Sequence, residues 1–327
     1  MKKALYPLLI VAVMISAALS LMLGSANIPP SQLFSAICGE KGYETQRVIL
    51  LSIRLPRFFA SALSGIGLSV AGLLLQNFSQ NRLASPNTVG LNAGAGFAVV
   101  LVLSLFPQLS PILPFFSFLG ALLAMIPVLT VGRFSASKSS SMLLAGVAFS
   151  ALFNGAISFI CSLDSDVLSD YNAFGVGGFS SILPQELYLP AILILLCFTV
   201  ALFLAPGLAL LALGKDQARS LGVNSSLMST LTLLLASLLT ASVISFAGLL
   251  GFVGLIVPNL VSYLAPQASF RERMVLCALV STVLVSLSDL LGRCLFSPGE
   301  ISVGIIMAFI GAPFFLALII KRKSYND

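Results

Sequence analysis

Histidine is absent from the sequence, and charged residues are scarce. Without an imidazole side chain there is no histidine metal ligand, no histidine proton relay and no Ser-His catalytic pair. Charged residues make up 9% of the chain, whereas about 25% is typical of soluble domains. So few charges could not cover the apolar surface of a soluble fold. The composition therefore excludes a disordered chain, a secreted disulfide scaffold and a nucleic-acid-binding domain.

Motifs for nucleotide and metal binding are also missing. The sequence has no GxxxxGK[ST] phosphate loop, so any ATP hydrolysis must occur on another chain. The cysteines are odd in number and show no CxxC spacing, which favours packing residues over disulfides or metal ligands. They are Cys38, Cys161, Cys197, Cys277 and Cys294. We expect no cofactor and no catalytic residue.

Apolar residues dominate the rest of the chain. They make up 58% of 327 residues, or about 190 positions, and a membrane-spanning helix needs about 20. The sequence predicts an all-α, polytopic membrane protein with about ten transmembrane helices in a single domain, residues 1–327. The expected spans are 4–24, 56–76, 88–106, 112–132, 140–162, 187–206, 226–246, 249–265, 272–291 and 302–320. In the nearly unbroken region 226–265, the glycines of SFAGLLGFVG must supply the turn.

Basic residues indicate the orientation. With a cytoplasmic N-terminus, twelve of the 17 Lys and Arg residues fall in cytoplasmic segments and five fall outside, in agreement with the positive-inside rule. An even number of spans then places the C-terminal residues Lys321, Arg322 and Lys323 inside as well. We expect both termini in the cytoplasm. The net charge of +6 thus reflects topology in the lipid bilayer and requires no nucleic-acid partner.

Ionisable residues are missing from the middle of the expected spans. Asp289, near the outer end of the ninth span, comes closest. An ion-coupled transporter usually needs an intramembrane carboxylate or a broken-helix ion site, and a channel needs a carbonyl filter or a charged ring. A membrane enzyme would need a nucleophile, metal ligands or paired acids. None is evident, which leaves a transporter whose energy comes from another protein.

One cytoplasmic loop has the features of a contact for such a protein. Asp216 can cap a short helix, Gln217 to Leu221 fit that helix, and Gly222 fits its end. A short amphipathic helix suits a groove in a soluble partner, although a plain solvated loop is the alternative. The loop residues are Gly214, Lys215, Asp216, Gln217, Ala218, Arg219, Ser220, Leu221 and Gly222.

Three arginines lie on the opposite side of the membrane, against the positive-inside bias. Arg54 and Arg57 lie at the start of the second span, and Arg293 follows the ninth. Carboxylates of a docking protein would match them, because guanidinium pairs with carboxylate through two parallel hydrogen bonds. Anchoring to lipid headgroups is the alternative.

Five segments resemble the permease family of type II, binding-protein-dependent ABC importers for iron-siderophores and vitamin B12 (FecCD-type). In chain order and spacing they are RLPRFFASALSGIGLSVAGLLLQNFSQNRLASPNTVGLNAGAGFAVV (54–100), MLLAGVAFSALF (142–153), GKDQARSLGVN (214–224), GFVGLIVPNLV (251–261) and GEISVGIIMAFIGAPFFLALII (299–320). The resemblance implies a ten-helix permease fold in the cytoplasmic (inner) membrane of a prokaryote.

The resemblance also implies partners and roles. It implies a second permease subunit, identical or paralogous, a cytoplasmic ABC ATPase dimer and an extracytoplasmic substrate-binding protein. Residues 214–224 would couple the permease to the ATPase, and Arg54, Arg57 and Arg293 would meet glutamates of the binding protein. Ser139, Ser140 and Ser141 are gate candidates. The expected substrate is a ferric siderophore, with a catecholate as one option. Vitamin B12 or haem is the nearest alternative, and an ion-coupled secondary transporter is the alternative from another class.

Overall fold

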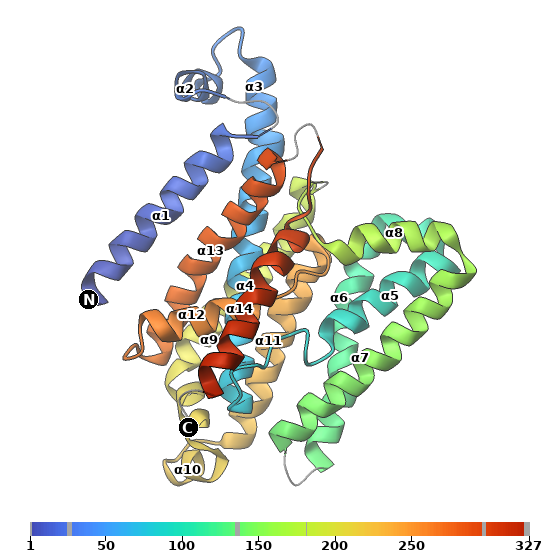
Figure 1. Ribbon diagram of the computed structural model, residues 1–327, viewed down its shortest axis with the longest axis vertical. Helices are drawn as coiled ribbons and strands as arrows, with labels where there is room; N and C mark the ends of the chain where they lie inside the picture. The colour runs from blue at the N-terminus through green and yellow to red at the C-terminus, as the bar shows by residue number, and fades with distance from the viewer. Residues whose placement is uncertain (1, 25–27, 135–137, 181, 296–298, 324–327) are drawn as a thin grey trace.

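Helices make up the regular structure of the protein. The computed structural model describes residues 2–24, 28–134, 138–180, 182–295 and 299–323, and within these ranges every regular element is a helix (Figure 1). In chain order they are α1 (Lys2–Met22), α2 (Pro30–Cys38), α3 (Glu44–Val48), η1 (Ile49–Arg54), α4 (Leu55–Ser79), α5 (Leu91–Leu105), η2 (Pro107–Ile112), α6 (Leu113–Phe134), α7 (Lys138–Leu163), α8 (Ser165–Val176), α9 (Pro184–Leu210), η3 (Leu211–Leu213), α10 (Lys215–Ser220), α11 (Ser225–Ala247), α12 (Val253–Leu264), α13 (Phe270–Leu295) and α14 (Val303–Lys323).

Each of the ten predicted spans coincides with a helix. By length and composition, seven described segments can cross a membrane: Leu5–Met22, Glu44–Ser79, Pro107–Val131, Ser141–Leu163, Pro184–Leu213, Ser225–Ala247 and Phe270–Leu295. The remaining three are shorter apolar helices, Leu91–Leu105, Val253–Leu264 and Val303–Ala317. At about 1.5 Å per residue, α5 and α12 are shorter than the roughly 30 Å hydrocarbon core, whereas the third stretch is the first part of the 21-residue helix α14. The prediction of an all-α polytopic membrane protein is confirmed.

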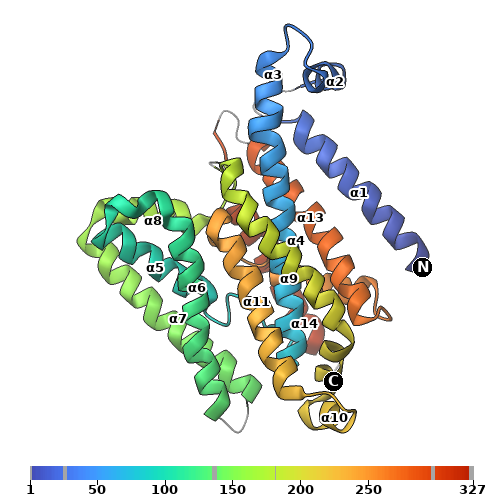
Figure 2. The same ribbon diagram turned by 180° about the vertical axis from the view of Figure 1, so that it is seen from behind.

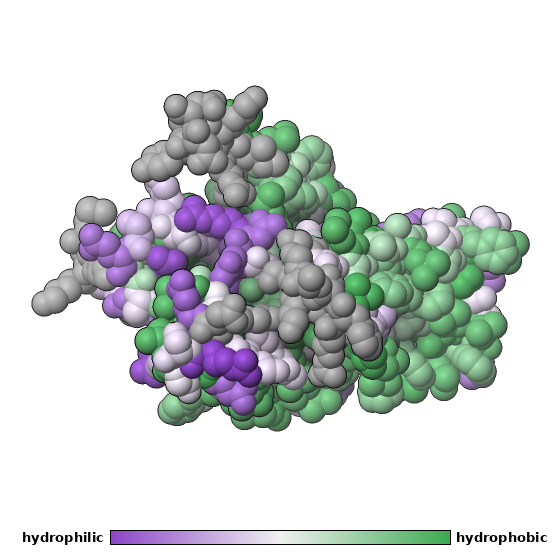
Figure 3. Space-filling model, turned by 90° about the horizontal axis from the view of Figure 1, so that it is seen from below, coloured by the Kyte–Doolittle hydropathy of each residue, from purple (hydrophilic) through white to green (hydrophobic). Residues whose placement is uncertain are grey.

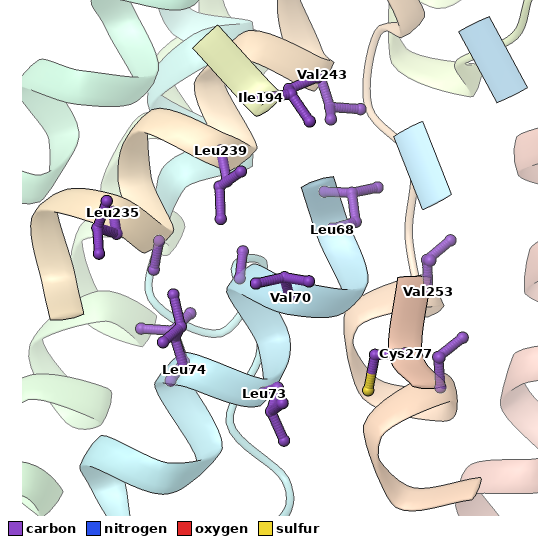
Figure 4. Packing of buried hydrophobic residues seen from close by; sticks show 14 of the residues in the cluster. Leu68, Val70, Leu73, Leu74, Ile194, Leu235, Leu239, Val243, Val253 and Cys277 are labelled. Carbon is purple, nitrogen blue, oxygen red and sulfur yellow. The ribbon is translucent and has the colours of Figure 1, made fainter. Parts of the chain in front are cut away.

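Helix α4 lies at the centre of the larger bundle, packed against α9, α11, α12 and α13 (Figures 1 and 2). Residues 68–75 are buried without interruption, so every face of the helix is covered, as expected for a core helix. Figure 4 shows side chains of α4 facing those of its neighbours; the labelled residues are Leu68, Val70, Leu73, Leu74, Ile194, Leu235, Leu239, Val243, Val253 and Cys277.

Small residues allow the helices to approach closely. A Cβ atom at Gly72 of α4 would overlap the backbone of Gly254 in α12. Likewise, a Cβ atom at Gly94 of α5 would overlap Ala124 of α6. In lipid, where no hydrophobic effect drives helices together, such backbone contact is a main source of packing energy.

Helices α5 to α8 form a second group beside α11 (Figures 1 and 2). Ala95 and Ala121 of this group share a buried cluster with Ala241 and Ile244 of α11. Large apolar side chains on the outer surface are well exposed, for example Leu144 at 71% and Phe203 at 75%. Such exposure is expected where the neighbour is lipid.

The predicted turn between the seventh and eighth spans is present. Helix α11 ends at Ala247, and α12 begins at Val253. Gly248 has φ +68°, a left-handed conformation that glycine adopts at low cost. Phe252 also has a positive φ, +64°, and a Cβ atom added at Gly311 of α14 would overlap its ring.

Candidate functional site

Four charged side chains form a cluster at the end of the bundle that carries α2, which we call the α2 end (Figure 1). Nε of Arg57 in α4 lies 3.0 Å from each carboxylate oxygen of Asp289 in α13, and Nη2 of Arg57 lies 2.9 Å from Oδ1. Nη1 of Arg57 donates to Oε2 of Glu300 at 2.8 Å. Arg293 lies four residues after Asp289 on the same face of α13, with its Nε 3.2 Å from Oδ2.

The arginines also bind the end of α1. Nη1 of Arg54 donates to the carbonyl of Leu21 at 2.6 Å, and Arg293 donates to the carbonyl of Ser20 at 3.4 Å. The last four carbonyls of a helix have no partner within the helix, and its C-terminus favours positive charge. The cluster therefore joins α1, α4 and α13.

All three arginine side chains are buried within this chain. Arg54, Arg57 and Arg293 are 4%, 6% and 5% exposed, because carboxylates and carbonyls of this same chain surround them. Within the cluster, the side chain of Glu300 keeps 34% exposure. The docking role of the arginines stays a prediction.

Sequence reasoning missed Asp289 and Glu300 as partners of the arginines. A signal was available within α13, because Asp289 and Arg293 are separated by four residues and helical neighbours at that spacing interact. No comparable signal links Arg57 to Asp289, which lies 232 residues away.

At the opposite end, which we call the α10 end, the predicted short helix is present. Gly222 has φ +81°, its N–H donates to the carbonyl of Arg219, and the N–H of Val223 donates to the carbonyl of Ala218. This pair of hydrogen bonds is the Schellman arrangement that ends helices at glycine. The predicted end at Gly222 is confirmed.

The predicted start of α10 is wrong by two residues. The N-cap is Gly214, with φ +97°, and the helix begins at Lys215. Asp216 therefore occupies the second helical position instead of the cap. Gly214 takes the cap position because the chain passes from η3 into α10 with a positive φ at this residue. Residues with a side chain adopt such a φ only at a cost.

The surface of α10 is suited to a partner. Ala218 is fully buried and holds the helix against the bundle, while Gln217, Arg219, Ser220 and Leu221 are exposed. Figure 3 views the molecule from this end and shows hydrophilic residues gathered over the main bundle, whereas the α5–α8 group is predominantly hydrophobic. The described part of α10 therefore offers both polar groups and an apolar leucine.

The three serine gate candidates lie in the first turn of α7, at the α10 end (Figure 1). The side chains of Ser139 and Ser140 lie outside the described residues, and that of Ser141 is partly buried. Their proposed role remains a prediction.

Residues 9–321 match the FecCD transport family. The chain belongs to this family. It is 33% identical over 326 residues to the ferric enterobactin transport system permease protein FepD of Escherichia coli, covering 97% of this chain and 95% of the relative. It is 30% identical over 328 residues to the hemin transport system permease protein HmuU of Yersinia pestis, covering 98% of both chains.

A solved structure confirms the fold. The chain is similar to a protein described as an inward-facing, metal-chelate type ABC transporter, with a TM-score of 0.85 and 27% identity. The similarity covers 98% of this chain and all of that one. The predicted type II importer permease fold is therefore confirmed, and the chain is an integral membrane permease subunit of an ABC importer.

Proposed function

We propose that this permease moves a ferric siderophore across the cytoplasmic membrane, driven by ATP hydrolysis on a separate cytoplasmic ABC ATPase dimer. The observation that carries this proposal is the match to permeases of iron-chelate import systems along nearly the whole chain. Haem is the second candidate, because HmuU matches over the same length. A catecholate siderophore is the narrower form of the proposal.

ATP would act through α10. Its exposed residues present hydrogen-bonding groups to the aqueous phase, and the C-cap residue Leu221 adds one large apolar side chain, as a groove-binding helix does. We infer that this end, with both chain termini, faces the cytoplasm, in line with the distribution of basic residues. A second permease subunit, identical or paralogous, would complete the path.

The substrate-binding protein would dock at the α2 end. Asp289 occupies Nε and Nη2 of Arg57, whereas Nη1 pairs with the partly exposed Glu300. A carboxylate of the binding protein would therefore reach Arg57 by replacing Glu300. On this reasoning Glu300→Gln, which removes the competing charge, should tighten docking, and an unchanged or weaker affinity would contradict the proposed contact.

Reconstitution tests the function directly. The permease is placed in liposomes with its ATPase, and uptake of ferric enterobactin and of haemin is measured in parallel, with and without ATP and the binding protein. We expect uptake of one chelate that requires both additions. Uptake by the permease alone would instead support an ion-coupled transporter.

A further inference from the structure

Two amide side chains near the end of α4 reach across to the segment that leads into α10. Nδ2 of Asn77 donates to the carbonyl of Leu208 in α9 at 2.6 Å. Nε2 of Gln80 lies 3.4 Å from the carbonyl oxygen of Leu211 and 3.2 Å from that of Ala212, both in η3. The central helix of the bundle is thus tied directly to the base of α10.

The backbone of Gln80 is unusual. Its φ is +52°, in the left-handed region, where it forms the C-cap of α4. Glycine or asparagine is the usual residue at such a position, because other residues lose stability there. A non-glycine residue held in this conformation is a reason to look for a function of its side chain. Here the side chain is the one that holds η3.

The amide of Gln80 also lies next to the first residue of the α10 segment. A Cβ atom built on Gly214 would lie 3.9 Å from Nε2 of Gln80. On the far side, Nε of Arg271 at the start of α13 donates to the carbonyl of Leu202 in α9 at 3.1 Å. The segment from the last part of α9 through η3 is therefore held from two helices, and the contact of Gln80 with η3 is the one nearest to α10.

We propose that Asn77 and Gln80 are positioning residues that pass the movement of α10 to α4. This inference rests on the proposed function, in which the ATPase moves α10. Because α4 is buried between α9, α11, α12 and α13, a displacement of α4 changes the packing of all four. The amides provide a polar connection of defined geometry, whereas apolar contact alone would allow η3 to slide.

Gln80→Gly separates this role from simple support of the fold. Glycine accepts the positive φ without strain, so the substitution removes the amide while relieving a backbone cost. Gln80→Asn also tolerates this backbone but has a shorter side chain, so it should give an intermediate effect. Asn77→Ala removes the second connection. Gln185→Ala removes an exposed amide at the other end of α9 and is the matched control.

The test compares these variants with wild type in proteoliposomes containing the ATPase and binding protein. Uptake of ferric enterobactin and haemin per ATP hydrolysed is measured, together with ATPase co-purification and thermal stability. For Gln80→Gly and Asn77→Ala we expect normal co-purification with the ATPase and a melting temperature close to wild type. The coupling ratio, which is the uptake per ATP hydrolysed, should fall about fivefold. One or two lost hydrogen bonds produce an effect of this size. Gln185→Ala should match wild type.

Two results would overturn the inference alone. One is a wild-type coupling ratio in both Gln80→Gly and Asn77→Ala. The other is a loss of ATPase binding or of thermal stability that accounts for the reduced uptake, since the amides would then be structural. If the wild-type complex itself showed no ATP-dependent uptake, the proposed function would fail, and the inference with it.

Discussion

Asp289 is the residue whose substitution should most strongly affect the stability of the α2 end. It is 3% exposed, and both Arg57 and Arg293 contact its carboxylate. Asp289→Asn keeps the size of the side chain but leaves two buried guanidinium groups without their shared anion. Removing one partner of a buried ion pair typically costs about 3–5 kcal/mol. We expect the lower end, about 3 kcal/mol, because Glu300 and the carbonyls of α1 still accept hydrogen bonds from the arginines.

Thermal unfolding in detergent, followed by size-exclusion chromatography, measures this effect. An unfolding entropy of about 2.1 cal/mol/K per residue gives roughly 0.7 kcal/mol/K for 327 residues. A loss of about 3 kcal/mol should therefore lower the melting temperature of Asp289→Asn by about 4 °C. Glu300→Gln is the control, because its partly exposed pair should contribute only about 0–1 kcal/mol. If Asp289→Asn and Glu300→Gln melted at the same temperature as wild type, the stabilising role assigned to the buried cluster would be wrong.

Three further substitutions probe the packing of α4 and the geometry of α10. Gly72→Val should strongly reduce the yield of monodisperse protein, because even its Cβ overlaps the backbone of Gly254, whereas Gly155→Ala, which points into open space, should not. Ala218→Pro removes the N–H that donates to the carbonyl of Gly214 at 2.9 Å. It should abolish ATP-driven uptake without preventing membrane insertion. The control Ala218→Ser retains that N–H and should keep most of the uptake. Gly222→Val places a β-branched residue at φ +81° and should weaken ATPase co-purification, with Gly222→Asn showing a smaller loss because asparagine tolerates this conformation.

The helices were predictable because a lipid environment requires long apolar segments, and such segments are visible in composition alone. Helix lengths were less predictable. The segment 249–265 is nearly as apolar as the full spans, yet α12 covers only Val253–Leu264. Its start depends on the left-handed backbone of Phe252, a residue type that carries no signal for that conformation.

The short helix at the α10 end and the charged cluster at the α2 end differ in predictability for a physical reason. Gly222 ends α10 through hydrogen bonds to residues within five positions, so a local pattern sufficed. The arginines are buried by partners from distant segments, including Asp289 and Glu300. Arginine near a membrane surface looks exposed when only its neighbours in sequence are known.

Two prolines inside helices explain why some polar side chains reach across to a neighbouring helix. A proline has no N–H, so the carbonyl four residues earlier loses its helical partner, and an unsatisfied carbonyl is costly where no water reaches it. Pro258 leaves the carbonyl of Gly254 without a donor, and Nε2 of Gln76 in α4 supplies one at 3.2 Å. Pro206 likewise leaves the carbonyl of Leu202 without its helical donor, and this carbonyl accepts a hydrogen bond from Nε of Arg271.

These two substitutes come from other helices, so Pro258 and Pro206 each mark a point where two helices are joined by a polar contact. Gln76 joins α4 to α12, and Arg271 joins α13 to α9. Asn77 and Gln80 extend the same use of side-chain donors to the end of α9, next to α10. The amides at the end of α4 therefore lie where several helices can be moved together, which is the arrangement that a coupling device in an otherwise apolar bundle requires.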